Sequence, residues 1–399
     1  MNIAIYTITS TLHNEEAIAA ATRLFLDSLN IEYDFRGEDF SDYGSHTLSL
    51  IYVRTGGTEG IFRQLLPELQ KRSSHPFYLL TSGKSNSLAA SMEILSYLRQ
   101  HQLQGEIIHG SVDYIKRRID LLTQVASAKT KLKGCRLGVI GEPSDWLISS
   151  AADYERVKNL LGIELIDIPM KELLETLGST PMTTPKESSE TEKIQQALPG
   201  ANQIYLALKQ LTERYQLQGF TLRCFDLLSA VKNTGCLALA KLNSEGYVAG
   251  CEGDVPAMLS MMISRALTGV SGFQANPARI NPETGEMLFA HCTIPLNMVE
   301  RFELDTHFES GIGVGIRGYM KPGSVTLFKV SGNLSRNSIQ EGELTDNQAQ
   351  PDLCRTQQII RLDDPSQTHY FLTNPIGNHH IIIPGRHKSA LEEILKGLS

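Results

Sequence analysis

Residues 48–60 read LSLIYVRTGGTEG, an apolar run that leads into a glycine-rich turn. The apolar part, 48–53, is typical of a buried strand, and a helical pattern begins directly after the turn. A strand, a tight turn and a helix in this order form one unit of an α/β fold, in which parallel strands alternate with helices. Two interpretations of the turn stay open: a backbone cradle for an anion, or a bend that needs glycine for its conformation.

The same alternation continues on both sides of this unit. Further strands are expected at 2–6, 77–81 and 106–109, and helices at 14–29 and 86–99. A second series begins with the strand-like CRLGVIG at residue 135. It continues with a helix near 154–161, strands at 164–168 and 221–225, and a helix at 201–215. Both series predict parallel sheets covered by helices.

The pattern changes after residue 255, where one strong helix, 257–267, is followed by short strand-like runs. Examples are 287–292, 313–318, 325–330 and 380–383. Such runs favour antiparallel structure of the kind that closes into a barrel. We therefore predict an N-terminal α/β domain at 1–132, a second α/β domain at 133–250, and a β-rich, barrel-like domain with one helix at 251–399.

Composition narrows the class of protein. The chain has 399 residues, of which 41% are hydrophobic and 20% charged, with a net charge of -7. Two or three globular domains are expected at this length, and the acidic balance argues against a nucleic-acid partner. The six cysteines form no CxxC pair, and neither a signal peptide nor a long apolar span is evident. We expect a cytoplasmic protein with free thiols and no membrane partner.

The strongest candidate for chemistry is GCEGDVPAMLSMMISRALTG, residues 250–269. Glu252 and Asp254 lie two positions apart, immediately before a helix with Pro256 in its first turn. Asp254 also fits the N-cap of that helix, and this structural interpretation stays open beside a functional one. However, the surrounding residues are apolar, so ionised carboxylates here need a partner, and a cation is the simplest one.

Other candidates lie outside this segment. Asp226 follows an apolar strand, where α/β domains place ligand-binding residues, and Arg223 beside it is either its ion-pair partner or a substrate anchor. An ordinary surface or capping aspartate is an equally good interpretation of Asp226. His291 lies in FAHCTIP, and His379 and His380 follow NPIGN. Because neighbouring side chains of an extended segment point in opposite directions, only one of His379 and His380 is expected to face a given site.

Four motifs together resemble a known family. They are RCFDLL at 223–228, the segment 233–269 that ends in GCEGDVPAMLSMMISRALTG, AHCTIP at 290–295, and GNHH at 377–380. This pattern resembles the L-fucose isomerase-like family, with the arabinose isomerases as more distant relatives. The resemblance is strongest over 220–295 and returns near 374–380, whereas the N-terminal half matches only in architecture. It implies two Rossmann-like domains followed by a β-rich domain, in agreement with the organisation above.

The resemblance also implies a function, namely aldose–ketose isomerisation of a small sugar by a homo-oligomer that binds Mn²⁺, Mg²⁺ or Co²⁺. It implies Asp226, Asp254 and His379 as metal ligands, and the two aspartates as the catalytic proton-transfer groups. Arg223, Glu252 and His291 are then expected to bind substrate. Two departures stand out: L-fucose isomerases have a glutamate where this chain has Asp226, and this chain is shorter than they are. His291 in turn resembles a metal-binding histidine of the arabinose isomerases.

Two alternatives stay open at this stage. One is a sugar-binding or regulatory homologue that has lost catalysis, which the exchange of glutamate for aspartate supports. The other is an isomerase of an anionic sugar, such as a sulfonated or phosphorylated one. The fold alone does not decide between them.

Overall fold

The computed structural model of this chain describes residues 2–73 and 75–396. The chain forms two compact units, Met1–Ser127 and Ala128–Ser399, which are described separately. None of the helices in the described residues combines the length and apolar character that a bilayer span requires.

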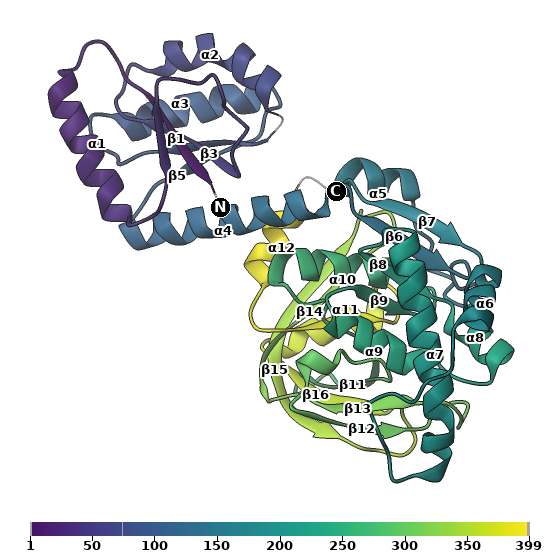
Figure 1. Cartoon of the computed structure of the whole chain (residues 1–399). Helices are drawn as coiled ribbons and strands as arrows, with labels where there is room; N and C mark the ends of the chain where they lie inside the picture. The colour runs from purple at the N-terminus through teal and green to yellow at the C-terminus, as the bar shows by residue number, and fades with distance from the viewer. Residues whose placement is uncertain (1, 74, 397–399) are drawn as a thin grey trace. The chain divides into compact units, whose positions relative to one another are not determined.

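The first unit contains a five-stranded parallel sheet in the order β2-β1-β3-β4-β5. Figure 1 labels β1, β3 and β5 of this sheet. Its strands are β1 (Ile3–Ile8), β2 (Asp34–Gly37), β3 (Leu48–Val53), β4 (Phe77–Leu80) and β5 (Gly105–Ile108). Its helices are α1 (Glu15–Leu29), α2 (Glu59–Arg72) and α3 (Ser87–Gln100), and α4 (Val112–Leu132) begins in it. Apolar residues of α2 and α3 pack on one face of the sheet, and those of α1 and α4 pack on the other.

The glycine-rich turn between β3 and α2 is a tight bend. Gly57 has a φ of +73°, which favours glycine. The N–H of Gly56 donates to the carbonyl of Ser85 at 2.7 Å, and the hydroxyl of Thr58 donates to the carbonyl of Thr55 at 3.0 Å. The Gly56 N–H and the Thr58 hydroxyl, which an anion in this turn would need as donors, are therefore already bonded to carbonyls of the chain.

The second unit combines a parallel sheet with a closed barrel. The sheet has the order β7-β6-β8-β9, with β6 (Arg136–Ile140), β7 (Glu164–Ile168), β8 (Gly219–Leu222) and β9 (Val248–Cys251). Its helices are α5 (Tyr154–Leu161), α6 (Met170–Ser179), α7 (Glu192–Arg214), α8 (Cys224–Val231) and α9 (Cys236–Ser244). The predicted fold class is confirmed: α/β layers with parallel sheets precede a β-rich part.

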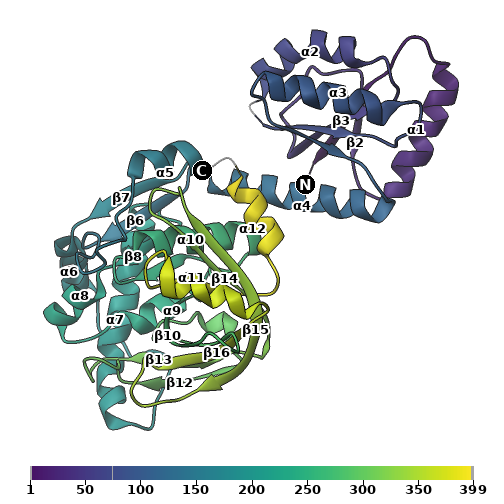
Figure 2. The same ribbon diagram turned by 180° about the vertical axis from the view of Figure 1, so that it is seen from behind.

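The barrel has six antiparallel strands in the closed order β10-β11-β16-β15-β14-β17. Figure 2 labels β10, β14, β15 and β16 of this barrel. They are β10 (Phe273–Asn281), β11 (Glu286–His291), β14 (Gly323–Val330), β15 (Asn337–Gln348), β16 (Thr356–Leu362) and β17 (His380–Pro384). The strands β12 (Arg301–Asp305) and β13 (Gly315–Tyr319) form a separate pair. Besides the expected helix, α10 (Val255–Thr268), this part contains the short helices α11 (Thr368–Thr373) and α12 (Lys388–Leu395).

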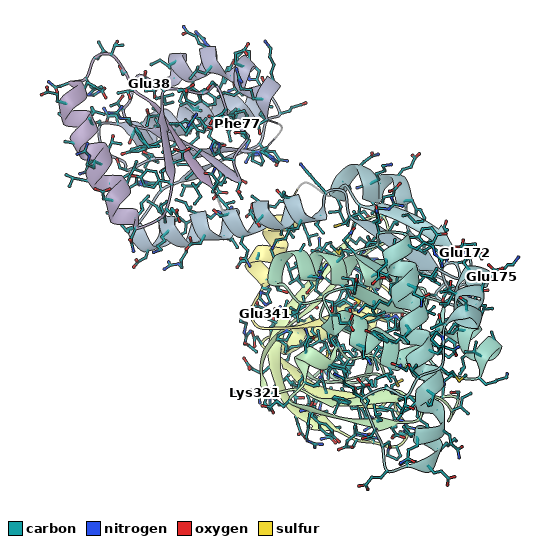
Figure 3. All side chains as sticks on the ribbon, viewed as in Figure 1. Glu38, Phe77, Glu172, Glu175, Lys321 and Glu341 are labelled. Atoms are coloured by element: carbon teal, nitrogen blue, oxygen red, sulfur yellow. The ribbon has the colours of Figure 1, made fainter. Side chains whose placement is uncertain are left out.

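Helix α10 explains how sheet and barrel share one core. It follows β9 directly and contacts β8 and β9 of the sheet as well as β14 and β17 of the barrel. Nearly all of its residues are buried, which is why it is apolar on every side. Charged side chains such as Glu175 and Lys321 lie instead at the surface of this unit (Figure 3). The predicted domain boundary at residue 250 stays a prediction, because the helix just after it belongs to both layers.

Candidate metal centre

Glu252 lies in the short connection between β9 and α10. Glu252 has a φ of +61°, and Gly253 follows with +63°. A left-handed conformation is uncommon for a residue with a side chain, and it is maintained here by surrounding contacts. The Gly253 N–H donates to the carbonyl of Leu222 at 3.0 Å, and the Ser144 hydroxyl donates to the carbonyl of Glu252. A Cβ on Gly253 would lie 2.9 Å from Ser144, so the turn depends on glycine.

Glu252, His291 and His379 meet in a buried cluster. The Glu252 Oε1 atom lies 3.5 Å from His291 Nε2 and 3.6 Å from His379 Nε2. One potential ligand atom from each of the three residues lies within 4.8 Å of the others, and the described residues contain no other cluster of this kind. His291 ends β11 and His379 precedes β17, so the barrel supplies both imidazoles and the sheet supplies the carboxylate.

The outer nitrogens of both imidazoles are held by neighbouring groups. His379 Nδ1 donates to Asp254 Oδ2 at 2.9 Å, and His291 Nδ1 lies 3.0 Å from the Thr293 hydroxyl. Because an ionised carboxylate only accepts hydrogen bonds, the Nδ1 atom of His379 carries its proton. The Nε2 atom is therefore the one that is free to bind a cation, the arrangement by which carboxylates orient metal-binding histidines.

Asp254 is completely buried, and both of its carboxylate oxygens have partners. Its Oδ1 accepts from the N–H of Ala257 at 2.8 Å, so it is the N-cap of α10, and Lys329 Nζ lies 3.2 Å from its Oδ2. Burial alone would raise the pKa of Asp254, but Lys329 and His379 hold it well below its usual range. Asp254 is thus the N-cap of α10 and also contacts the cluster through His379, whereas its predicted role as a metal ligand stays a prediction.

The charges in the cluster explain its ionisation. Burial alone would raise the pKa of Glu252, but His291 and His379 hold it well below its usual range. Burial alone would lower the pKa of His379, but Asp254 and Glu252 raise it to about 9. Without a cation, a proton on His379 therefore provides the positive charge that the two carboxylates require.

These residues fit a divalent cation. The Nε2 atom of His379 is buried and has no hydrogen-bond partner in the described structure, although it lies opposite a carboxylate. A buried polar atom without a partner is costly, and a metal ion between it and Glu252 would remove that cost. Two imidazoles and one carboxylate suit Mn²⁺, Co²⁺ and other first-row ions better than Mg²⁺, which prefers oxygen ligands.

The other predicted site residues lie elsewhere. Asp226 is in the first turn of α8, and its Oδ2 lies 2.9 Å from Arg223 Nε. Arg223 also contacts Asp145 at 3.1 Å and lies over the ring of Trp146. The structure thus brings Asp254 and His379 together but does not place Asp226 with them. The expected ligand set of Asp226, Asp254 and His379 is not assembled, because an i,i+3 ion pair holds Asp226 against Arg223 on the helix surface.

A pocket lies beside the cluster. It has about 30 Å³ of space for water-sized molecules within about 470 Å³ of empty volume that includes its open mouth. Its lining includes Glu252, His291, His307, Glu309, Phe225 and Leu228, together with five cysteines. His307 is almost fully buried, its Nδ1 lies 3.0 Å from the Ser310 hydroxyl, and burial lowers its pKa despite the nearby Glu309. His307 is therefore a neutral imidazole at pH 7.

Sequence reasoning missed Lys329 and His307. A signal existed for Lys329, because a single lysine in the apolar strand VTLFKV at 325–330 is unusual unless a buried anion pairs with it. No comparable signal existed for His307. It lies between β12 and β13, and only the packing of that segment brings it to the pocket.

The expectation that only one of His379 and His380 faces the site is met, and it leads to a stability prediction. His380 points away, accepts from the hydroxyl of Tyr370 at 3.0 Å, and is fully buried. Burial, with the nearby Lys329 charge, lowers the pKa of His380 to about 3. Since an unfolded histidine titrates near pH 6.5, the unfolded state gains a proton first as the pH falls. Between pH 7 and pH 5 we expect this group to remove about 2 kcal/mol of stability.

The test compares the native chain with His380→Gln by urea unfolding at both pH values. Trp146, the single tryptophan, lies in the second unit and reports on its unfolding. His380→Gln should lose about 2 kcal/mol less than the native chain between pH 7 and pH 5, because the titrating group is absent. Equal losses in the two proteins would contradict the assignment of a neutral, buried His380.

Comparisons with known proteins point to sugar isomerases. Residues 155–268 match the family described as "L-arabinose isomerase central domain". The sulfoquinovose isomerases of Priestia aryabhattai and Priestia megaterium are each 25% identical to this chain over 264 residues, which cover 62% of this chain and 59% of the relative. The sulfoquinovose isomerase of Clostridium sp. is 26% identical over 176 residues, 41% of this chain and 38% of the relative.

These matches support an L-arabinose/L-fucose isomerase-like superfamily rather than the L-fucose isomerase family in particular. The family match contains Glu252, Asp254 and α10 but ends before the barrel that supplies His291 and His379. The chain spans less than two thirds of the length of the relatives that it matches.

Proposed function

From this superfamily relationship and the geometry of the cluster, we propose that the chain is a metal-dependent aldose–ketose isomerase. The proposed ligands are Glu252, His291 and His379. The observation that carries the proposal is the buried Nε2 atom of His379, which lacks a hydrogen-bond partner and faces Glu252 beside a pocket. When bound there, a divalent cation would act as a Lewis acid for two neighbouring oxygens of an open-chain sugar.

The chain's own residues prepare this site. Asp254 orients His379, and Lys329 and the N-terminus of α10 keep Asp254 in place. The left-handed turn presents Glu252, and Thr293 fixes the ring of His291. Side chains that are held before the reaction starts need little reorganisation during it, which is a large part of catalysis by charged sites.

Proton transfer between C1 and C2 needs a group that can both accept and donate a proton. Asp254 is enclosed behind His379 with both oxygens engaged, which supports a positioning role rather than the proton transfer expected from the sequence. His307 lines the pocket and is neutral at pH 7, so it is suited to accept a proton from C2 and return it to C1. We assign this acid–base role to His307.

The class of sugar is a second question. The relatives named sulfoquinovose isomerase favour an anionic sugar. Within the described residues, however, no lysine or arginine lines the pocket, and the Arg223 charge is already matched by Asp145 and Asp226. The second candidate is therefore an isomerase of a sulfonated sugar in which Arg223 changes partner when substrate binds.

One experiment addresses both proposals. Purified full-length chain is titrated with Mn²⁺ by calorimetry and then incubated with neutral aldoses and with sulfoquinovose, while ¹H NMR follows the ketose. We expect one Mn²⁺ per chain and exchange of the C2 proton in at least one sugar. Metal binding without conversion of any sugar would favour the inactive homologue. Arg223→Ala tests the second candidate, since it should slow conversion of sulfoquinovose at least about tenfold and leave neutral sugars unchanged.

A further inference from the structure

Most of the cysteines of the chain line the pocket beside Glu252 and His291. All six cysteines are free, and five of them line this one pocket: Cys224, Cys236, Cys251, Cys292 and Cys354. They are far apart in the sequence and come from different elements of the sheet, the helices and the barrel. The proposed isomerase chemistry uses none of them.

Cys224 and Cys251 form the best-defined pair. The thiol of Cys251 donates to the sulfur of Cys224, and the two Sγ atoms are 3.4 Å apart. Cys251 ends β9 and pairs with Leu222 of β8, and α8 begins with Cys224 two residues later. The sheet register thus holds both sulfurs at the carboxyl ends of adjacent parallel strands, and Gln274 fixes the backbone of Cys251 at 2.9 Å.

The surroundings favour reaction between the two thiols over binding of a soft metal by them. Among the residues that the structure describes, no cysteine belongs to a group of three ligand atoms close enough for a metal ion. Cys224 is partly exposed, whereas Cys251 is buried behind it. This is the arrangement of a thiol that reacts first with an oxidant and a second thiol in position to resolve it.

We propose that Cys224 and Cys251 are a redox-active pair that closes to a disulfide when a peroxide reaches the pocket. Hydrogen peroxide is scarcely larger than water, so the pocket admits it. The Cys224 sulfur attacks one peroxide oxygen, which gives a sulfenic acid and one water. The Cys251 sulfur then displaces the hydroxyl from that sulfenic acid, which gives the disulfide and a second water. The two thiols together lose two electrons, and these electrons reduce one peroxide to two waters.

Closure has a consequence for the neighbouring ligand. A disulfide needs a sulfur–sulfur distance of about 2.05 Å, so the two sulfurs must approach by more than 1 Å, which draws the end of β9 and the start of α8 together. Glu252 follows Cys251 directly and sits in a left-handed turn with little freedom to compensate. This second step rests on the proposed metal site: oxidation should weaken Mn²⁺ binding at least about tenfold.

The first readout concerns the disulfide alone and does not depend on any enzyme activity. Reduced, full-length chain is treated with hydrogen peroxide, unfolded, and its free thiols are blocked and counted. We expect the count to fall from six to four. Peptide mass spectrometry without reduction should join Cys224 to Cys251, and dithiothreitol should restore all six thiols. A disulfide between Cys292 and Cys354, or six unchanged thiols, would overturn the proposal.

A pair of variants separates this pocket chemistry from general oxidation. After the same treatment, Cys224→Ser should keep all five of its remaining thiols. Cys135→Ser changes a cysteine that does not line the pocket, so it should still lose two of its five thiols. Calorimetry with Mn²⁺ before and after oxidation, each protein compared with its own untreated sample, tests the second step. A mapped disulfide without any change in Mn²⁺ affinity would refute the coupling to Glu252. Absence of Mn²⁺ binding in the reduced chain would instead count against the proposed isomerase.

Discussion

Replacing Glu252 with glutamine should lower the affinity for Mn²⁺ by about 100-fold or more and remove measurable sugar isomerisation. Glu252 is the one carboxylate of the three-residue cluster, and its Oε1 atom lies within 3.6 Å of both imidazole Nε2 atoms. Glutamine keeps the shape of the side chain but removes the negative charge that a divalent cation needs. Calorimetric titration with Mn²⁺ at pH 7.5 measures the affinity, and ¹H NMR of the sugar measures turnover.

The matched control for this change is Asp226→Asn. It removes one carboxylate from the same unit by the same chemical change, at a position that pairs with Arg223 rather than with the cluster. Its Mn²⁺ affinity should stay within about threefold of the native chain, as is usual for changes at exposed ion pairs. If Asp226→Asn loses the metal and Glu252→Gln keeps it, the ligand set inferred from the sequence is correct and the one proposed from the structure is wrong.

A folding control accompanies both variants. Glu252 is largely buried against two histidines, so its replacement also changes the local charge balance. Circular dichroism and Trp146 fluorescence should show a folded second unit in Glu252→Gln. A folded protein that has lost Mn²⁺ then identifies a ligand rather than a structural residue.

Lys329→Met should lower the free energy of unfolding of the second unit by about 3–5 kcal/mol. Lys329 is 1% exposed, Asp254 is 0% exposed, and their charged atoms are 3.2 Å apart. Methionine fills similar space but leaves Asp254 as a buried carboxylate without its lysine partner. Breaking a buried pair in this way costs far more than the pair contributes when intact. Urea unfolding followed by Trp146 fluorescence measures the loss.

The double variant Lys329→Met/Asp254→Asn provides the control. It removes both charges, and asparagine can still accept the Ala257 N–H as the cap of α10. We expect it to recover at least half of the stability that Lys329→Met loses, because no unpaired charge remains. A single variant that costs less than about 1 kcal/mol, or a double variant as unstable as the single one, would show that the pair is not a buried charge pair in solution.

Much of the fold followed from local sequence patterns. The strand at 48–53 has the bounds Leu48–Val53, and the apolar runs at 287–292 and 325–330 lie on β11 and β14. These elements are buried and continuous, so hydrophobic periodicity identifies them. The strand β2, Asp34–Gly37, was not expected, because this edge strand is largely exposed and lacks an apolar run.

Part of the candidate site could also be predicted from local sequence patterns. The segment 250–254 was the best candidate from its residues alone, because two carboxylates in an apolar setting need a partner wherever they lie. The sequence also showed that Asp254 suits an N-cap and that one of His379 and His380 would face a site. Each of these inferences depends only on residues that are neighbours along the chain.

Only the tertiary structure decided which groups meet. Lys329, His291 and His379 reach the segment 250–254 because the barrel closes and α10 packs between it and the sheet. The family resemblance implied Asp226 as a ligand beside Asp254 and His379, but in the structure Asp226 pairs with Arg223, three residues before it. Local patterns specify what a side chain needs, whereas long-range packing specifies which partner supplies it. The sequence alone therefore identified Glu252 and Asp254 as candidates, and the fold placed Glu252 beside His291 and His379 and placed Asp254 against the Nδ1 atom of His379.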